Sequence, residues 1–327
     1  MSPLLHVETL RIAAGPHAPA LVDGISLELD RGKALGLVGE SGAGKTLACL
    51  ALLRLLPEGL HIQDGRIRLD GQELTALTDT EMRRLRGGRI GMVLQNPLSS
   101  LNPLMRIGDQ IGEAFAVHRG VRWRTALWKL AVEALRAVRI PTPEQRVSAY
   151  AHQFSGGMRQ RVAITMNIAC APDLLIADEP TTALDATIRL QVLRLLGDIR
   201  RERRMALILV THDLPMVARF CDDVAVMYAG RIVERGPVEA IFANPAHPYT
   251  RGLIGATPRL DGRRRLATIA GQPPSPGSIA SGCAFASRCD VADAGCRQGR
   301  IDLLDLGEQR AAACRKPFAR PPAEAAA

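Results

Sequence analysis

The chain has 327 residues, of which 47% are hydrophobic and 23% charged. This length exceeds one compact core of typical size, and the composition excludes a mostly disordered protein. The 42 Lys and Arg residues outnumber the 33 Asp and Glu residues, giving a net charge of +9 that favours an anionic partner such as a nucleotide, a nucleic acid or an acidic membrane surface. Aromatic residues make up only 3%, which disfavours a nucleic-acid reader that stacks bases.

Alternating and continuous apolar runs predict two kinds of strand. Alternation predicts a small antiparallel sheet at one edge, from residues 6–12, 25–29 and 66–69. Continuous apolar runs separated by long helix-like stretches predict buried parallel strands at residues 35–38, 174–177 and 207–210. The chain is therefore predicted to have an α/β fold.

The remaining patterns divide the rest of the chain. Residues 109–140 show a helical pattern that ends at Pro141 and Pro143 and predicts an inserted helical unit, with a further helix starting near Gly157. Residues 224–228 and 231–234, separated by Ala-Gly, predict a β-hairpin. The proline-rich stretch 272–277 marks a boundary, beyond which periodicity is weak.

No apolar run approaches the roughly 18 residues of a membrane span, and the first residues lack the basic and apolar regions of a secretory signal. We therefore expect a cytosolic chain, in which cysteines are not structural disulfides. Cys49, Cys170 and Cys221 stand singly in apolar contexts that predict small buried hydrophobes. The other four crowd the end of the chain and point to metal or redox chemistry: Cys283, Cys289, Cys296 and Cys314.

The segment Gly-Glu-Ser-Gly-Ala-Gly-Lys-Thr fits the phosphate-loop pattern G-x-x-x-x-G-K-[ST] and lies between a predicted strand and a predicted helix. Its glycines let backbone N–H groups surround the β- and γ-phosphates, next to the positive end of the helix. Lys45 is expected to bridge the outer phosphates and Thr46 to hold Mg²⁺. The predicted phosphate-binding residues are Gly39, Ser41, Gly42, Ala43, Gly44, Lys45 and Thr46.

Two further segments support a P-loop NTPase that binds Mg·ATP. The apolar run 174–177 ends in Asp178 and Glu179, which suits an Asp that orients Mg²⁺ and a Glu that activates water. Ser155, Gly156 and Gly157 precede a helical run, so their backbone N–H groups are predicted to form a second anion site at a helix N-terminus.

Residues 153–161, which contain this Ser-Gly-Gly, resemble the signature motif of ATP-binding cassette (ABC) ATPases. The resemblance extends to two further residues. Gln95 is similar to the family's glutamine that senses Mg²⁺ and couples to membrane subunits. His212 is similar to the family's switch histidine, which contacts the γ-phosphate. Residues 183–185 (Ala-Leu-Asp) resemble the loop that crosses the family's dimer interface. The family pairs two ATPases head to tail, so that each ATP lies between one phosphate loop and the opposite Ser-Gly-Gly. Glu179, His212 and Gln95 are thereby predicted to be catalytic.

Two departures from the family pattern stand out. The signature reads Phe-Ser-Gly-Gly-Met where the commonest form is Leu-Ser-Gly-Gly-Gln, which keeps the anion-binding core. The family usually places an aromatic residue after the first strand to stack on adenine, whereas residues 10–20 contain no Phe, Tyr or Trp. His17 is a candidate substitute, and the base contact stays unassigned.

Longer stretches resemble the dipeptide/oligopeptide importer branch: residues 95–103, 150–158, 177–185 and 244–250. The resemblance implies a nucleotide-binding domain at 1–255, with a helical subdomain at about 97–170, and a C-terminal extension at 256–327. It implies an ATPase that energises import of di- or oligopeptides, at the cytoplasmic face of the bacterial inner membrane as a peripheral subunit. The implied partners are a homologous ATPase in a heterodimer, two transmembrane permease subunits and an external peptide-binding protein acting through the permease, with no nucleic acid.

Other readings of the family resemblance stay open. Nickel chelates or other peptide-like cargo fit an importer ATPase equally well. A cassette ATPase acting on nucleic acid in DNA repair or translation fits the basic charge, although neither a second cassette nor a long coiled coil occurs in this chain. A purely regulatory nucleotide-binding module is disfavoured because Glu179 and His212 are both present.

The four C-terminal cysteines are separated by 5, 6 and 17 residues, wider than the pairs of a small zinc module. Four thiolates at varied spacing suit an iron–sulfur cluster. Some peptide-importer ATPases are similar in this respect, so the resemblance implies a [4Fe–4S] cluster held by these cysteines. A zinc site and four reduced thiols are the alternatives.

Overall fold

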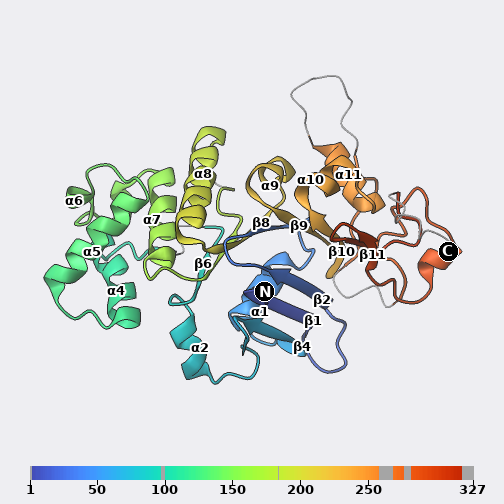
Figure 1. Ribbon diagram of the computed structural model, residues 1–327, viewed down its shortest axis with the longest axis horizontal. Helices are drawn as coiled ribbons and strands as arrows, with labels where there is room; N and C mark the ends of the chain where they lie inside the picture. The colour runs from blue at the N-terminus through green and yellow to red at the C-terminus, as the bar shows by residue number, and fades with distance from the viewer. Residues whose placement is uncertain (1, 97–99, 183, 258–267, 276–280, 319–327) are drawn as a thin grey trace. The chain divides into compact units, whose positions relative to one another are not determined.

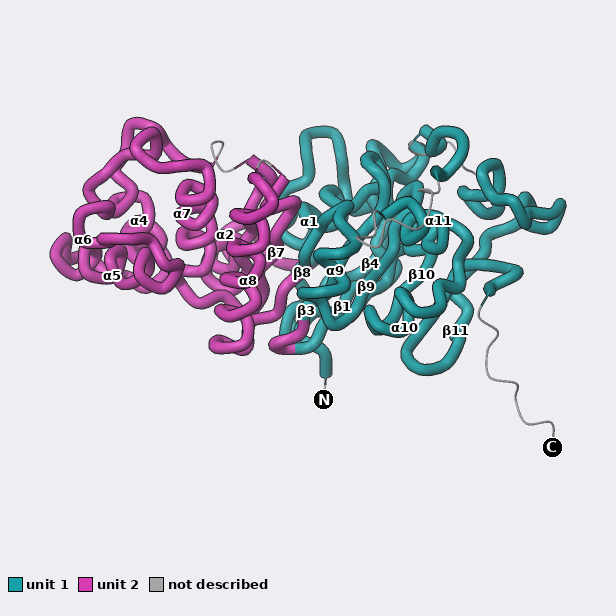
Figure 2. Tube along the Cα trace, turned by 90° about the horizontal axis from the view of Figure 1, so that it is seen from above, with its two compact units in different colours: residues 1–30, 34–75, 209–327 teal, residues 31–33, 76–208 magenta. Residues whose placement is uncertain are grey.

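The computed structural model describes residues 2–96, 100–182, 184–257, 268–275 and 281–318. Its contacts divide the chain into two compact units, with residues 1–30, 34–75 and 209–327 in unit 1 and residues 31–33 and 76–208 in unit 2 (Figure 2). Parts of three segments named above, at residues 97–99, 183 and 276–277, lie outside the described residues.

Unit 1 contains the predicted antiparallel sheet, in the order β2 (Val22–Leu29), β1 (Leu5–Ala13), β4 (His61–Leu69) and β5 (Gln72–Glu73). Leu5 of β1 stands opposite Leu29 of β2 and Leu69 of β4, so apolar side chains meet across neighbouring strands. The three predicted strands are confirmed, and β5 adds a short strand that the alternation did not indicate.

A second run of strands in unit 1 leads to the phosphate loop. The order is β11 (Leu304–Gly307), β12 (Arg310–Ala312), β10 (Arg231–Pro237), β9 (Asp223–Tyr228) and β3 (Ala34–Val38). β3 is parallel to β9, whereas β9 and β10 form the predicted hairpin, with left-handed backbone at Ala229 and Gly230. The hairpin of β11 and β12 was not predicted, and it returns the end of the chain to this sheet through β10.

The helices of unit 1 include one that starts within the phosphate loop, two that follow later strands, and one that follows the second of these two helices (Figure 1). They are α1 (Lys45–Leu52), α9 (Leu214–Phe220), α10 (Val238–Ala243) and α11 (Pro248–Ala256), together with the 3₁₀ turn η2 (Ala294–Arg297).

Unit 2 pairs β6 (Ile90–Val93) in parallel with β7 (Leu174–Asp178), and β8 (Ala206–Thr211) begins in unit 2 and ends in unit 1. Every residue of β3, β7 and β8 is buried, which confirms the three predicted buried strands. β6 was not predicted, because a four-residue strand containing glycine leaves little periodicity to detect.

The helices of unit 2 are α2 (Asp79–Leu85), α4 (Ile107–Arg119), α5 (Arg124–Ala137), α6 (Pro143–Arg146), η1 (Ala151–Gln153), α7 (Gly156–Ile168) and α8 (Ala186–Arg203). The helical pattern at 109–140 contains a break, because Gly120 adopts a left-handed conformation that ends α4. No helix in the described ranges is both long and apolar enough to cross a membrane.

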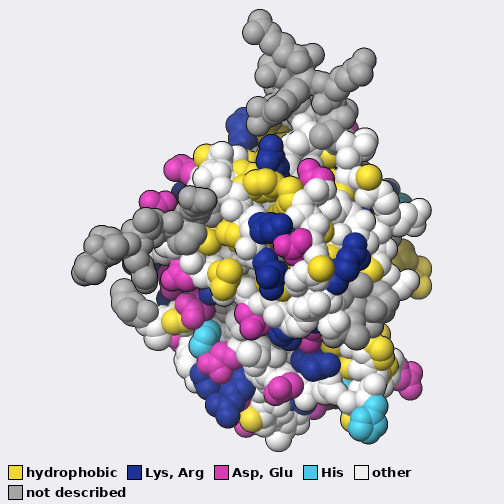
Figure 3. All heavy atoms as spheres, turned by 90° about the vertical axis from the view of Figure 1, so that its right-hand side faces the viewer, with side chains coloured by type: hydrophobic (Ala, Val, Ile, Leu, Met, Phe, Trp, Pro, Cys, Tyr) yellow, Lys and Arg dark blue, Asp and Glu magenta, His cyan; other side chains and the backbone are white. Residues whose placement is uncertain are grey.

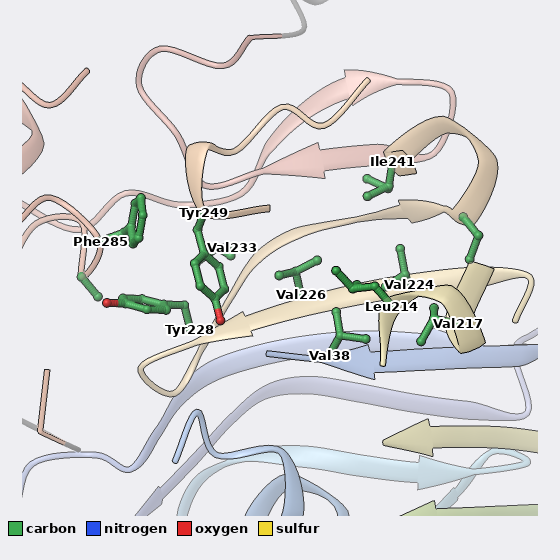
Figure 4. Packing of buried hydrophobic residues seen from close by; sticks show 12 residues of the cluster. Val38, Leu214, Val217, Val224, Val226, Tyr228, Val233, Ile241, Tyr249 and Phe285 are labelled. Atoms are coloured by element: carbon green, nitrogen blue, oxygen red, sulfur yellow. The ribbon is translucent and has the colours of Figure 1, made fainter. Parts of the chain in front are cut away.

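The apolar core of unit 1 extends from the strands to the end of the chain. Val38, Val224 and Val226 form its strand side, against Leu214 and Val217 of α9. At one end of the cluster Tyr228, Tyr249 and Phe285 lie side by side (Figure 4). Phe285 belongs to the cysteine-containing part of the chain, so that part shares the core of the phosphate-loop sheet.

Candidate functional site: the phosphate loop, the acidic strand end and the four-cysteine region

The phosphate loop begins directly after the buried strand β3 and includes the first two residues of α1. A Cβ on Gly39 would lie 2.2 Å from the carbonyl oxygen of Met227, so only glycine allows β9 to approach this closely. Gly44 is the N-cap of α1 at φ +97°, a left-handed conformation that favours glycine. The loop is supported by β9 and by the turn after it, where Gly230 N–H donates to the Ala43 carbonyl at 3.0 Å.

Lys45 is buried, and its ammonium lies within the curve of the loop. Its Nζ donates to the carbonyl oxygens of Gly39 at 2.8 Å and Glu40 at 2.9 Å. Ser41, Gly42 and Thr46 are exposed, as residues that contact a nucleotide must be. The structure therefore places the predicted phosphate-binding residues on one loop with a cation at its centre, which suits polyphosphate.

The acidic strand end lies in unit 2. Asp178 is the last residue of β7 and is buried, and Glu179 follows with φ +45°, a left-handed conformation that costs a non-glycine residue about 1–2 kcal/mol. Oε2 of Glu179 accepts hydrogen bonds from Gln95 Nε2 at 3.0 Å and Thr182 Oγ1 at 2.8 Å. The structure thus brings together Gln95 and Glu179, two residues that are 84 positions apart and that the family resemblance assigns to one ATP site.

The Ser-Gly-Gly segment stands at the start of α7. Ser155 is the N-cap, and its Oγ accepts the Met158 N–H at 3.4 Å. Ser155 and Gly156 are exposed, so the N-terminal N–H groups of a 13-residue helix face solvent. This is the arrangement predicted for a second anion site.

The other predicted residues have simpler surroundings. His212 is exposed directly after β8 in unit 1. Asp185 caps α8 by accepting the N–H groups of Thr187 and Ile188. His17 is exposed in the loop after β1, and its contact with adenine stays a prediction.

The four C-terminal cysteines line one small cavity, together with His247 and Phe285. We call residues 281–318, which carry these thiols, the four-cysteine region. Cys314 is buried and the other three are half-buried. Sequence separation alone did not show that the four thiols share one cavity. In the described part of the chain, no group of three or more His, Cys, Asp or Glu side chains is in position to hold a metal ion.

Burial disfavours charge on these thiols. It raises the pKa of Cys283 and Cys289, and it raises the pKa of Cys314 to about 11. Each of these thiols also lies close enough to a neighbouring cysteine for their negative charges to repel. Thiolates in this cavity therefore require a compensating cationic group, which is what a metal centre supplies.

Two side chains contact the phosphate loop although no sequence pattern assigns them to it. The Tyr249 hydroxyl accepts the Glu40 backbone N–H at 2.8 Å, and the Arg288 guanidinium binds the Glu40 carboxylate. Both lie more than 200 residues beyond the loop, and Arg288 belongs to no motif. Only the tertiary structure identifies them.

A buried strand, a glycine loop with a central lysine, an acidic strand end and a Ser-Gly-Gly helix start define the class of ABC ATPases. The family described as ABC transporter matches residues 22–182, and the family described as oligopeptide/dipeptide transporter, C-terminal region, matches residues 233–296.

Named relatives agree with both matches. The oligopeptide transport ATP-binding protein OppD of Haemophilus influenzae is 44% identical over 91% of this chain and 92% of its own length. The dipeptide transport ATP-binding protein DppD of Bacillus subtilis is 45% identical over 88% and 87%. Among solved structures, cbiO1 from Clostridium perfringens, part of the ABC transporter complex cbiONQ, superposes with a TM-score of 0.65 and 27% identity over 74% of this chain and 92% of its own.

The chain therefore belongs to the ABC transporter family of ATPases, in the branch that carries the oligopeptide/dipeptide transporter C-terminal region. It has the P-loop NTPase fold and is an ATPase.

Proposed function

We propose that this chain is the ATP-hydrolysing subunit that energises import of di- or oligopeptides across the cytoplasmic membrane. The observation that carries the proposal is the pairing of a complete phosphate loop with a peptide-transporter C-terminal region in one chain. Relatives named for oligopeptide and dipeptide transport support the cargo class.

The chain's residues divide the chemistry among them. Lys45 and the N–H groups of residues 39–46 bind the phosphates, and Glu179, oriented by Gln95 and Thr182, accepts the proton of the attacking water. His212 stabilises charge on the γ-phosphate. Thr46, Asp178 and Gln95 would hold Mg²⁺, and the ion would supply positive charge that stabilises the phosphate oxygens. Ser155, Gly156 and Gly157 serve the ATP of the opposite subunit in a heterodimer.

The surface of unit 2 supports a docking role toward two permease subunits. Leu94, beside Gln95, is 40% exposed, and Leu104 and Trp123 are 86% and 80% exposed. These side chains lie beside Gln95 and in the predicted helical subdomain, where the resemblance implies docking on the permease. We place permease docking here, at the cytoplasmic face of the membrane, with the external peptide-binding protein acting through the permease.

A nucleic-acid function is the alternative, and the face seen in Figure 3 gives it no support. On the face seen in Figure 3, Lys and Arg side chains lie among acidic and hydrophobic ones instead of forming a continuous basic surface. A protein that tracks a phosphate backbone needs such a surface.

Reconstitution tests the transport proposal. The full chain, its partner ATPase and the two permease subunits are placed in vesicles, and ATP hydrolysis is measured with binding protein plus peptides, with nickel chelates, or with DNA or RNA. Stimulation by peptide is expected. Stimulation by nucleic acid and not by peptide would refute the proposal, and stimulation by nickel chelate alone would replace its cargo.

We further propose that Cys283, Cys289, Cys296 and Cys314 hold a [4Fe–4S] cluster. One buried and three half-buried thiols line a shared cavity, Cys₄ ligation suits such a cluster, and its iron would offset the cost of burying thiolates. Zinc is the alternative occupant. Anaerobic purification followed by iron, sulfide and zinc analysis decides: four iron and four sulfide per chain support the cluster, and one zinc without iron refutes it.

A further inference from the structure

Arg288 is an unusual residue for a loop, because its guanidinium is charged and its side chain is only 4% exposed. All five of its N–H groups have acceptors. Two bind the Glu40 carboxylate, from Nη1 at 2.7 Å and from Nη2 at 3.0 Å, and the others reach Tyr228 Oη, the Ala270 carbonyl and the Ile269 carbonyl. A forked, fully satisfied arginine defines the position of its carboxylate partner closely.

That partner belongs to the phosphate loop. Glu40 lies between Gly39 and Ser41, and each of its polar groups is engaged. Its carboxylate binds Arg288, its N–H donates to Tyr249 Oη, and its carbonyl accepts from Lys45 Nζ and from the Ala43 N–H. Glu40 is therefore the residue at which the C-terminal part of the chain holds the loop that binds phosphate.

The segment that carries Arg288 also carries two cysteines of the cavity. We call residues 283–289 the Arg288 loop, because Cys283 and Cys289 end it and both pack against the apolar core of unit 1. Two turns link its ends, with the Ala286 N–H bound to the Cys283 carbonyl and the Arg288 N–H to the Phe285 carbonyl. The guanidinium stands 5.7 Å from the Phe285 ring, which lines the cysteine cavity. Displacing either thiol therefore displaces the support of Arg288.

We propose that Arg288 is a positioning residue through which the four-cysteine region sets the affinity of the phosphate loop for ATP. While the four thiols are held together, the Arg288 loop fixes Glu40 and keeps the phosphate loop in its binding conformation. When the thiols are released, Glu40 loses its partner and ATP binds more weakly. The link to a bound metal group rests on the proposed cluster, whereas the contact between Arg288 and Glu40 does not.

A double-mutant cycle in the full chain tests this inference. ATP affinity is measured by titration with a fluorescent ATP analogue for the wild type, Arg288→Gln, Cys314→Ser and the double variant. Cys314 lies on a different segment from Arg288, so an effect of its loss on ATP must be transmitted. Each single variant is expected to weaken binding about tenfold, and the double variant by no more than about twofold beyond either single.

Further readouts separate positioning from general loss of structure. Arg288→Lys, which keeps the charge, should recover part of the affinity, and the rate at saturating ATP should stay within about twofold of wild type. Arg136→Gln is the control, because Arg136 is an exposed arginine of α5 in unit 2 that pairs with Glu144, and it should leave ATP affinity unchanged. Thermal unfolding reports the folding of every variant.

The outcomes divide clearly. Unchanged ATP affinity in folded Arg288→Gln overturns the positioning role, and additive effects in the double variant overturn transmission from the cysteines. Metal analysis of the same samples is independent: a wild type without iron or zinc refutes the cluster, while the cycle still decides the role of Arg288.

Discussion

The phosphate loop and the four-cysteine region are both irregular segments that carry chemistry, yet they are organised by different means. The phosphate loop is a short motif whose central Lys45 binds the carbonyls of Gly39 and Glu40, and Gly230, Tyr249 and Arg288 support it from distant parts of the chain. The four-cysteine region contains little regular structure, and its cavity combines Cys283 with His247 and Cys314 from distant segments. Chemistry encoded in a short motif is detectable from the sequence even where distant residues support it, whereas chemistry assembled from distant segments depends on the core between them.

The largest effect should come from a residue in a short motif. Glu179→Gln removes the carboxylate that is placed to accept a proton, so kcat for ATP should fall by roughly 10² to 10⁴ while ATP still binds. Steady-state hydrolysis and equilibrium ATP binding measure the two quantities. Glu202→Gln, an exposed change in α8, is the control and should behave as wild type. Undiminished hydrolysis in Glu179→Gln would remove Glu179 from the mechanism.

The second effect probes the core that supports the four-cysteine region. Phe285→Ala empties a buried position that contacts the rings of Tyr228 and Tyr249, and it should lower the free energy of unfolding by about 3–5 kcal/mol. Denaturant unfolding measures the change. Phe318→Ala, at a ring that is 39% exposed, should cost far less. Equal costs for the two variants would mean that Phe285 does not anchor this region.

A third effect depends on pH. Burial lowers the pKa of His247 to about 3, below its ordinary value of 6.5. Between these values the unfolded chain binds a proton that the folded chain does not, so stability falls as pH falls from 6.5, by about 2 kcal/mol at pH 5.

Unfolding measured at pH 7 and pH 5 for wild type and His247→Asn checks this expectation. Asn keeps an acceptor at the N-cap of α11, where His247 Nδ1 accepts the Tyr249 N–H, but it does not titrate. The other charged groups that face position 247 are the same in both proteins. They are Glu234, which accepts the backbone N–H of residue 247, and Arg315 and Lys316, which line the cavity. The same pH slope in both would exclude His247 as its source.

The smallest effect on stability should occur at the exposed surface of unit 2. Leu104→Gln should change the free energy of unfolding by less than about 0.5 kcal/mol and leave ATP hydrolysis by the isolated chain unchanged. In reconstituted vesicles it should weaken stimulation by peptide, because the docking surface loses an apolar anchor. Full peptide stimulation of this variant would place the permease contact elsewhere.

The sequence by itself determined the parts of the molecule that depend on local order. Periodicity, glycine placement and helix capping over a few residues were enough to predict these parts. They are the phosphate loop after β3, the strands β1, β2, β3, β4, β7 and β8, the hairpin of β9 and β10, and Ser155 at the start of α7. These features are predictable because their energetics lie within one or two turns or strands.

Only the tertiary structure decided which distant residues meet. It placed Gln95 against Glu179, brought four cysteines to one cavity, and bound Arg288 to Glu40 across 248 positions of the sequence. The physical reason is that such contacts form when distant segments bury a shared core. The core that brings Arg288 to Glu40 includes Tyr228, Tyr249 and Phe285. Burial depends on apolar area, so it leaves no fixed spacing in the sequence.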